Sequence, residues 1–141
     1  MTKISIVSII DELDDNGLVE SSEKTEVTAD ATVTEIGGML TVAYSESSES
    51  GKCDSLITVK DSGITVSRTG SVVSEFRFSE GLTHKSLYKI PPYSFDAEIS
   101  TKKIRNNITQ GVGTLSILYD MSVGGGKKRV NMKITLTEVG G

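Results

Sequence analysis

LTHKSLYKIPPYSFDAEISTKKI is the sequence from Leu82 to Ile104, and this stretch indicates the fold of the whole chain. It contains both prolines, the only histidine and two of the four tyrosines. Beyond Pro91-Pro92, apolar or small residues alternate with polar ones, a period of two that is typical of a β-strand with one buried face. Proline has no N–H to donate to a neighbouring strand, so we expect one strand to end before the double proline and another to follow it.

The same alternation recurs along the chain and predicts about ten short strands with no long helix. Glycine-containing turns separate several of them, for example Gly37-Gly38 and Asp61-Ser62-Gly63. We expect the polar residues 45–54 to form a mobile loop and residues 105–107 to form a turn. The expected strands cover residues 3–10, 24–36, 39–46, 56–60, 64–68, 73–79, 86–90, 95–102, 112–119 and 129–137.

Consecutive strands joined by short turns predict an all-β fold. The predicted architecture is an antiparallel up-and-down (meander) β-barrel of about 8–10 strands, because closure removes exposed strand edges. A two-sheet sandwich would produce a similar pattern and stays open as an alternative. No linker or repeat divides the sequence, so we expect residues 1–141 to form a single barrel domain.

Composition and charge argue against several classes of partner. The formal net charge is −4, whereas nucleic acid or an anionic membrane needs a clustered positive field. The two basic clusters, residues 102–105 and 127–129, are expected at opposite barrel ends, which is a poor nucleic-acid footprint. The lone Cys53 gives no intrachain disulfide, and no segment approaches the roughly 18 apolar residues of a membrane span. We therefore expect a cytoplasmic monomer or homodimer with neither a nucleic-acid nor a membrane partner.

Several short motifs stand in a fixed order along these strands. They are Tyr44-Ser45-Glu46, Arg68-Thr69-Gly70, residues 88–93 (YKIPPY), Thr101, and Gly113-Thr114-Leu115 running to Tyr119. In their order and spacing the sequence resembles the YwiB-like family of small bacterial proteins of unknown function, over essentially its whole length. The family pattern has Pro-Tyr-Gly where this sequence has Pro92-Tyr93-Ser94. The resemblance implies a calycin-type (lipocalin-like) β-barrel and does not indicate any catalysed reaction.

Strand direction groups polar residues at one end of the predicted barrel. In an antiparallel meander every second strand ends at the same rim, and the strands ending there carry tyrosines, an arginine and a glutamate. An arginine on an inward-facing stripe is costly to bury unless it is paired, so we predict that Arg68 contacts Glu46 or a tyrosine hydroxyl. Asp120 is expected at the same rim. The candidate ligand-binding residues are Arg68, Glu46, Tyr44, Tyr88, Tyr93 and Tyr119.

Two interpretations of this rim are open. In one, the polar side chains plug the end of a filled barrel and satisfy each other, so the protein is structural or binds another protein, for instance through a sheet edge left by Pro91-Pro92. In the other, they orient a small molecule with a polar or anionic head and an apolar body in the lumen. A continuous cavity that reaches Arg68 would favour binding, whereas a lumen packed with aliphatic side chains would oppose it.

Weaker motifs point to no chemistry. Residues 12–23 approach the spacing of a calcium loop, but their flanks are predicted strands where an EF-hand needs helices. His84 is expected to be a surface histidine, without a nucleophile-elbow motif or zinc ligands nearby. Residues 124–128 (GGGKK) lack the phosphate-loop spacing and are expected to form a flexible hairpin. We therefore expect no catalytic residue, no metal and no cofactor.

Overall fold

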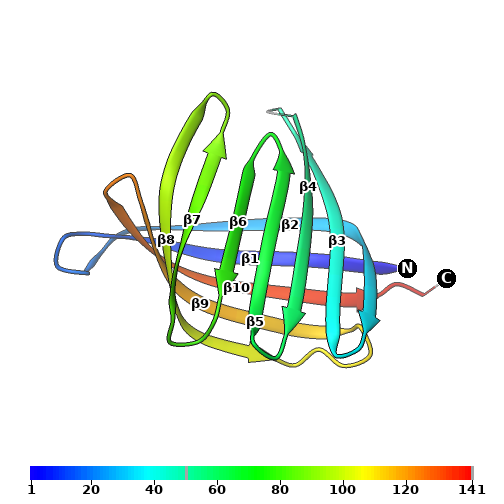
Figure 1. Cartoon of the computed structure of the whole chain (residues 1–141). Helices are drawn as coiled ribbons and strands as arrows, with labels where there is room; N and C mark the ends of the chain where they lie inside the picture. Colours follow the sequence, from blue (N-terminus) through cyan, green and yellow to red (C-terminus); the bar gives the residue numbers. More distant parts are fainter. Residues whose placement is uncertain (50, 141) are drawn as a thin grey trace.

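The computed structural model describes residues 1–49 and 51–140 and consists of ten β-strands (Figure 1). The described residues contain no helix long and apolar enough to cross a membrane. The strands are β1 (Thr2–Leu13), β2 (Val19–Ile36), β3 (Met39–Ser48), β4 (Gly51–Lys60), β5 (Gly63–Gly70), β6 (Val73–Phe78), β7 (Thr83–Ile90), β8 (Tyr93–Asn106), β9 (Gly113–Val123) and β10 (Gly126–Glu138).

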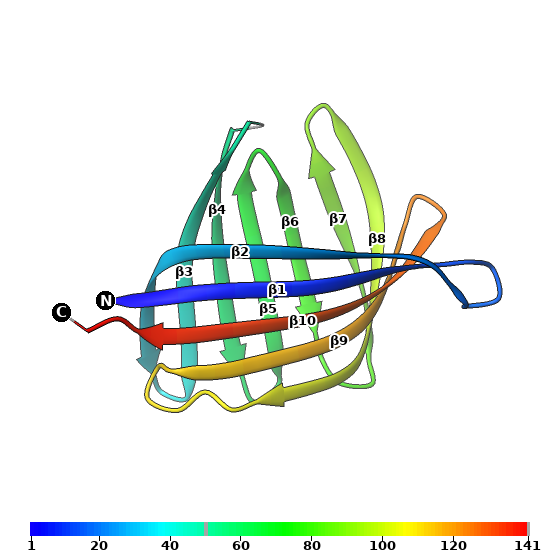
Figure 2. The same cartoon turned by 180° about the vertical axis from the view of Figure 1, so that it is seen from behind.

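Each strand pairs with its sequence neighbours in antiparallel fashion, and β10 pairs with β1, so the sheet is a closed up-and-down barrel. This confirms the predicted all-β meander barrel and rules out the sandwich alternative. Figures 1 and 2 show that β1, β2, β9 and β10 run across the direction of β3 to β7, on the other side of the barrel. The interior is therefore enclosed between two differently oriented groups of strands.

The expected loop at residues 45–54 is wrong. β3 continues to Ser48 and β4 begins at Gly51, with Ser45 opposite Asp54 and its hydroxyl donating to the Asp54 carboxylate at 2.6 Å. Cys53 is buried on the inward face of β4. These polar residues form strands because backbone pairing and outward-facing side chains suffice, although their hydropathy is that of a loop. Arg105 and Asn106, expected in a turn, lie in β8.

The predicted turns at Gly63 and at Pro91-Pro92 are both present. Gly63 begins β5 with a φ of +150°, and a Cβ there would lie 2.5 Å from the Phe78 carbonyl oxygen, so the hairpin requires glycine at this position. Pro91-Pro92, joined by a cis peptide bond, connects β7 and β8 at the tip of a projecting hairpin (Figure 1). β7 pairs with β8 along its length, so the double proline forms the turn of a continuous hairpin, and pairing with another protein through a sheet edge stays a prediction.

Inward-facing residues of neighbouring strands lie directly opposite each other in rows. We call the barrel end with the β3–β4, β5–β6 and β7–β8 turns the mouth, and the end with the β4–β5 and β6–β7 turns the packed end. Two apolar rows fill the packed end: Leu40, Val59, Ile64 and Phe78, then Val42, Ile57, Val66 and Phe76. Across the interior the ring of Phe78 contacts that of Tyr119, with centroids 4.7 Å apart. Side chains therefore occupy the packed end.

Candidate functional site

The next row toward the mouth is polar. Tyr44, Ser55, Arg68, Ser74 and Tyr88 lie directly opposite one another on five neighbouring strands, β3 to β7. We call these five residues the polar row. Each of the first four stands two residues along its strand from a member of the apolar row below, because side chains on one face of a strand recur with a period of two. The sequence thus places a belt of hydroxyls and one guanidinium directly on top of the core.

Arg68 and Glu46 pair at the mouth, as predicted. Nη2 of Arg68 donates to Oε1 of Glu46 at 3.3 Å, and their side chains are 31% and 25% exposed. A guanidinium has five N–H donors. Within the described part of the chain this is the only side-chain hydrogen bond that Arg68 makes. Most of its donor capacity is therefore free to bind water or a ligand.

The two serines of the polar row are buried without partners. Ser55 is 4% exposed and Ser74 is 5% exposed, and neither Oγ has a hydrogen bond of normal geometry to another described residue. Both flank Arg68 on the adjacent strands. Buried side-chain hydroxyls are hydrogen-bonded in most native proteins, and the described residues supply no normal partner for these two or for the hydroxyl of Thr101.

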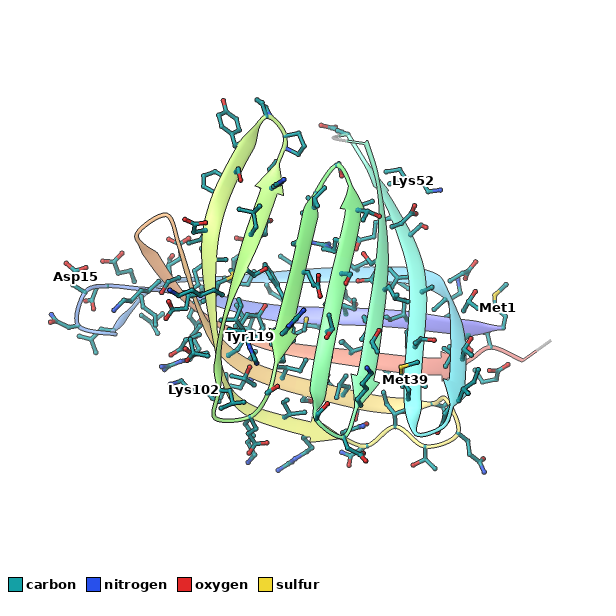
Figure 3. The ribbon with its side chains drawn as sticks, viewed as in Figure 1. Met1, Asp15, Met39, Lys52, Lys102 and Tyr119 are labelled. Carbon is teal, nitrogen blue, oxygen red and sulfur yellow. The ribbon has the colours of Figure 1, made fainter. Side chains whose placement is uncertain are left out.

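Burial shifts the pKa values of two tyrosines that lie on different sides of the barrel. Burial raises the pKa of Tyr119 to about 12. The charge of Arg68 lowers this pKa by a smaller amount, and Tyr88 raises it by a still smaller one. Burial likewise raises the pKa of Tyr44, while a weak hydrogen bond with the Ser55 hydroxyl, outside normal geometry, and then the charge of Arg68 lower it. Figure 3 shows Tyr119 among the side chains inside the barrel. At neutral pH both tyrosines are therefore uncharged, and Arg68 is the cation that a ligand would meet.

Three residues expected at the mouth do not join it. Tyr93 is 66% exposed on the tip of the β7–β8 hairpin and packs against Phe95, with ring centroids 6.5 Å apart. Asp120 lies on the outer face of β9 and pairs with Arg129 at 2.9 Å. Tyr119 is buried below the row, against Phe78. The strand-direction argument placed Tyr119 and Asp120 at the wrong end of the barrel: they pair with Thr101 and Ser100 of β8, which lie beside the β6–β7 turn of the packed end.

A groove of about 530 Å³ reaches the polar row from the side of the barrel. β6 and β7 are paired only at Val73–Lys89 and Ser74–Tyr88, and toward the packed end no further pairs follow. The groove follows this opening, which we call the side gap. It is lined mostly by outward-facing residues such as Lys85, and it meets Arg68 and Ser74 where the two strands are paired, with the Ser74 hydroxyl itself buried.

His84 is not the surface residue that we expected. It lies in β7 opposite the fully buried Ile99, and its Nε2 atom is buried without a hydrogen-bond partner among the described residues. Residues 12–23 form the β1–β2 hairpin, where Asp14 Oδ1 accepts hydrogen bonds from the backbone N–H groups of Asn16 and Leu18. Figure 3 shows Asp15 at the tip of this hairpin, away from the barrel. No group of three metal-binding side chains occurs among the described residues.

The basic clusters are not at opposite barrel ends. Lys102 from one and Arg129 from the other both reach the carboxylate of Asp120, at 3.7 Å and 2.9 Å. The reason is the register, which places Ser100 of β8 and Arg129 of β10 on either side of Asp120. The Gly124-Gly125 turn joins β9 and β10, as expected for a hairpin.

Sequence reasoning missed Ser55 and Ser74 altogether. Each occupies an inward position in its strand's alternation, between apolar or aromatic inward neighbours, so a polar residue at an inward position was the available signal. Their relation to Arg68 depends on the register of three strands, which the sequence pattern leaves open.

The comparisons with known proteins agree with this architecture. An uncharacterized β-barrel protein, YwiB of Bacillus subtilis (strain 168), is 30% identical over 100 residues, which is 71% of this chain and 70% of that protein. The crystal structure of the YwiB protein from Bacillus subtilis superposes with a TM-score of 0.75 at 23% identity, covering 97% of this chain and 92% of the other. The family model described as a domain of unknown function (DUF1934) matches residues 4–136. The chain therefore belongs to the DUF1934 family of β-barrel proteins of unknown function.

Proposed function

We propose that this protein binds a small molecule through a polar or anionic group at the polar row, without catalysing a reaction on it. The observation that carries the proposal is the incomplete bonding of the row. Arg68 uses one side-chain hydrogen bond, the buried hydroxyl of Ser74 uses none among the described residues, and that of Ser55 has only a weak contact with Tyr44. A plug of side chains that satisfied each other would leave no such buried groups. A carboxylate or phosphate accepts hydrogen bonds from a guanidinium and from hydroxyls together.

The packed end restricts what else the ligand contains. An apolar body was expected in the lumen, but Phe78 and Tyr119 meet across it. Apolar surface is instead available at the mouth, where Tyr88 stands opposite Phe95 and stacks on Phe76 with centroids 5.7 Å apart. We therefore place any apolar part of the ligand against Tyr88 and Phe95, at the level of the row. This is a shallow version of the calycin-type mode of binding, and we keep the cytoplasmic location that the sequence suggested.

The alternative is a structural or protein-interaction barrel whose interior is filled by its own side chains. The contact between Phe78 and Tyr119 favours it, because the lower interior needs no ligand to be filled. Under this alternative the buried serines bind ordered water, which commonly satisfies isolated buried polar groups.

Native mass spectrometry of the protein purified from its own host separates the two functions. We expect a retained small molecule in the wild-type protein and its loss in Arg68→Ala. Arg105→Ala, which removes an exposed arginine from β8, is the matched control and should retain it. If the wild-type protein carries no additional mass, or if Arg68→Ala carries the same mass, the binding proposal is wrong. Arg68→Ala would then only lower stability, by about 1 kcal/mol or more, because Glu46 loses its partner.

A further inference from the structure

β2 keeps a long edge without a neighbouring strand. β1 pairs with β2 from Val19 to Ala31, whereas β3 pairs with it only from Ala31 to Ile36. In an antiparallel pair every second residue directs its backbone N–H and C=O away from the partner strand. Among residues 1–49 and 51–140, no strand pairs with these groups on the side of β2 that faces away from β1. We call residues 21–30 of β2 the open edge.

The open edge lacks several of the usual protections against pairing with another chain. Natural edge strands are commonly short, bulged, interrupted by proline or covered by another element. The register of β1 and β2 shifts only between Glu12 and Leu13, opposite the residues that precede the open edge, and the open edge contains no proline. A regular, extended edge of this kind is a template to which another strand can be added.

The open edge faces the mouth of the barrel. Figure 2 shows β1 along one side of β2, and the turns of β3–β4, β5–β6 and β7–β8 rising beyond its other side. Ala31, the residue that follows the open edge, stands opposite Tyr44 of the polar row. A strand added to the open edge would therefore lie across the mouth, beside the polar row.

The charges of the open edge are complementary to those of a second copy. Lys24 and Glu26 are exposed, stand opposite apolar Ile9 and Val7 of β1, and form no ion pair among the described residues. In a symmetric antiparallel pair centred on Thr25, each Lys24 stands opposite the partner's Glu26, an arrangement that stabilises a sheet. Moving the centre by one residue places Lys24 or Glu26 opposite its own copy, and like charges in that position repel.

The β1–β2 hairpin would add a second contact. Figure 1 shows that this hairpin projects past the barrel, and its Leu18 and Val19 are exposed. In a pair centred on Thr25, the hairpin of the partner follows the open edge toward Ala31 and so reaches the mouth. Its exposed apolar side chains would there be removed from water, which favours association.

We propose that this protein forms a symmetric homodimer, in which the open edges of two copies pair in antiparallel fashion about Thr25 and the β1–β2 hairpin of each copy covers the mouth of the other. The inference does not depend on the proposed binding function, because it rests on the unpaired backbone and the charges of β2. It adds that residues of two chains enclose the polar row.

Light scattering coupled to size-exclusion chromatography, over about 1–100 μM protein, measures the dimer dissociation constant. We expect the wild type to be a dimer. Lys24→Glu and Glu26→Lys should each raise this Kd by about tenfold or more, because each change puts like charges opposite one another at two symmetric positions. The double variant Lys24→Glu/Glu26→Lys restores opposite charges and should dimerise like the wild type. Glu98→Lys and Lys103→Glu, which make the same charge changes at exposed positions of β8, should not alter the Kd.

A mixture of the two single variants, one of them isotope-labelled, gives a sharper test. Each homodimer carries like charges at the paired positions, whereas the heterodimer carries opposite ones, so native mass spectrometry should detect mainly heterodimer. Amide hydrogen exchange should be slowed at residues 21–30 when the wild type dimerises. A dimer that neither single variant weakens, a mixture without excess heterodimer, or exchange protection confined to other strands would overturn the proposal. A wild type that stays monomeric would also overturn it and leave the open edge to a strand of a different protein.

Discussion

The packed end and the polar row are built from the same strands, two residues apart, and yet they have opposite chemistry. Ile64 and Val66 of β5 lie in complete apolar rows, whereas Arg68, the next inward residue, lies between two serines. The two apolar rows of the packed end contain no polar side chain. In the polar row the single strong donor bonds one carboxylate and the hydroxyls beside it stay unpartnered.

This difference separates residues that stabilise the barrel from residues that are free to bind something. Apolar burial stabilises a fold in proportion to the area removed from water and needs no further partner. Buried hydroxyls without partners cost stability, so their presence in one row beside an arginine is the feature that packing alone does not explain.

The largest effect is expected from breaking the packed end. Phe78→Ala should lower the free energy of unfolding by about 3–5 kcal/mol, because it empties a buried site that contacts Tyr119 across the interior. Urea unfolding followed by circular dichroism measures it. Phe95→Ala, at a partly exposed position near the mouth, should cost about 1 kcal/mol or less. Equal losses in the two variants would show that the packed end does not carry the stability.

Alkaline pH tests the burial of Tyr119 between the two regions. Its pKa in the folded protein is raised from 10.0 to about 12, so the fold favours the neutral phenol. The stabilisation from the buried neutral phenol is complete below about pH 10 and is lost as the pH rises toward 12. Each pKa unit corresponds to about 1.4 kcal/mol, so the free energy of unfolding should fall by roughly 2–3 kcal/mol in total. Urea unfolding at pH 8 and pH 11 should show a decrease that is smaller in Tyr119→Phe. An unchanged pH dependence in that variant would place the loss elsewhere.

The Arg68–Glu46 pair should couple only modestly. Because both side chains remain partly exposed, a double-mutant cycle with Arg68→Ala and Glu46→Ala should give a coupling of about 1 kcal/mol. Denaturant unfolding of the four proteins provides the measurement. A coupling of about 3 kcal/mol or more would indicate a fully buried structural pair and would favour the filled-barrel alternative.

The smallest effect is expected from the buried serines, and its sign is informative. Ser55→Ala and Ser74→Ala remove unpartnered hydroxyls, so in the ligand-free protein they should leave stability unchanged or raise it by up to about 1 kcal/mol. Thermal unfolding measures this, and Ser45→Ala, whose hydroxyl donates to Asp54, is the contrasting control and should lose stability. A loss of about 1–3 kcal/mol in the buried variants would mean that water or side chains already satisfy these hydroxyls.

Much of the fold was predictable because turns and alternation are local properties. The double proline, Gly37-Gly38 and Asp61-Ser62-Gly63 each lie between the strands that the pattern indicated. Residues 45–54 were predicted wrongly because outward-facing strand residues can be as polar as loop residues. For the candidate site, alternation placed Tyr44, Arg68 and Tyr88 on inward faces, and strand direction brought Arg68 to Glu46.

The sequence by itself determined which face each side chain occupies and which end of the barrel each strand reaches, since both follow from the period of two and from antiparallel connection. Only the tertiary structure decided at which level between the mouth and the packed end each residue lies. It put Tyr93 on an exposed tip, Tyr119 under the row, and Ser55 and Ser74 beside Arg68. It also left only two paired positions between β6 and β7. The physical reason is that register and separation depend on the twist of all ten strands and on packing across the interior, between residues far apart in the sequence.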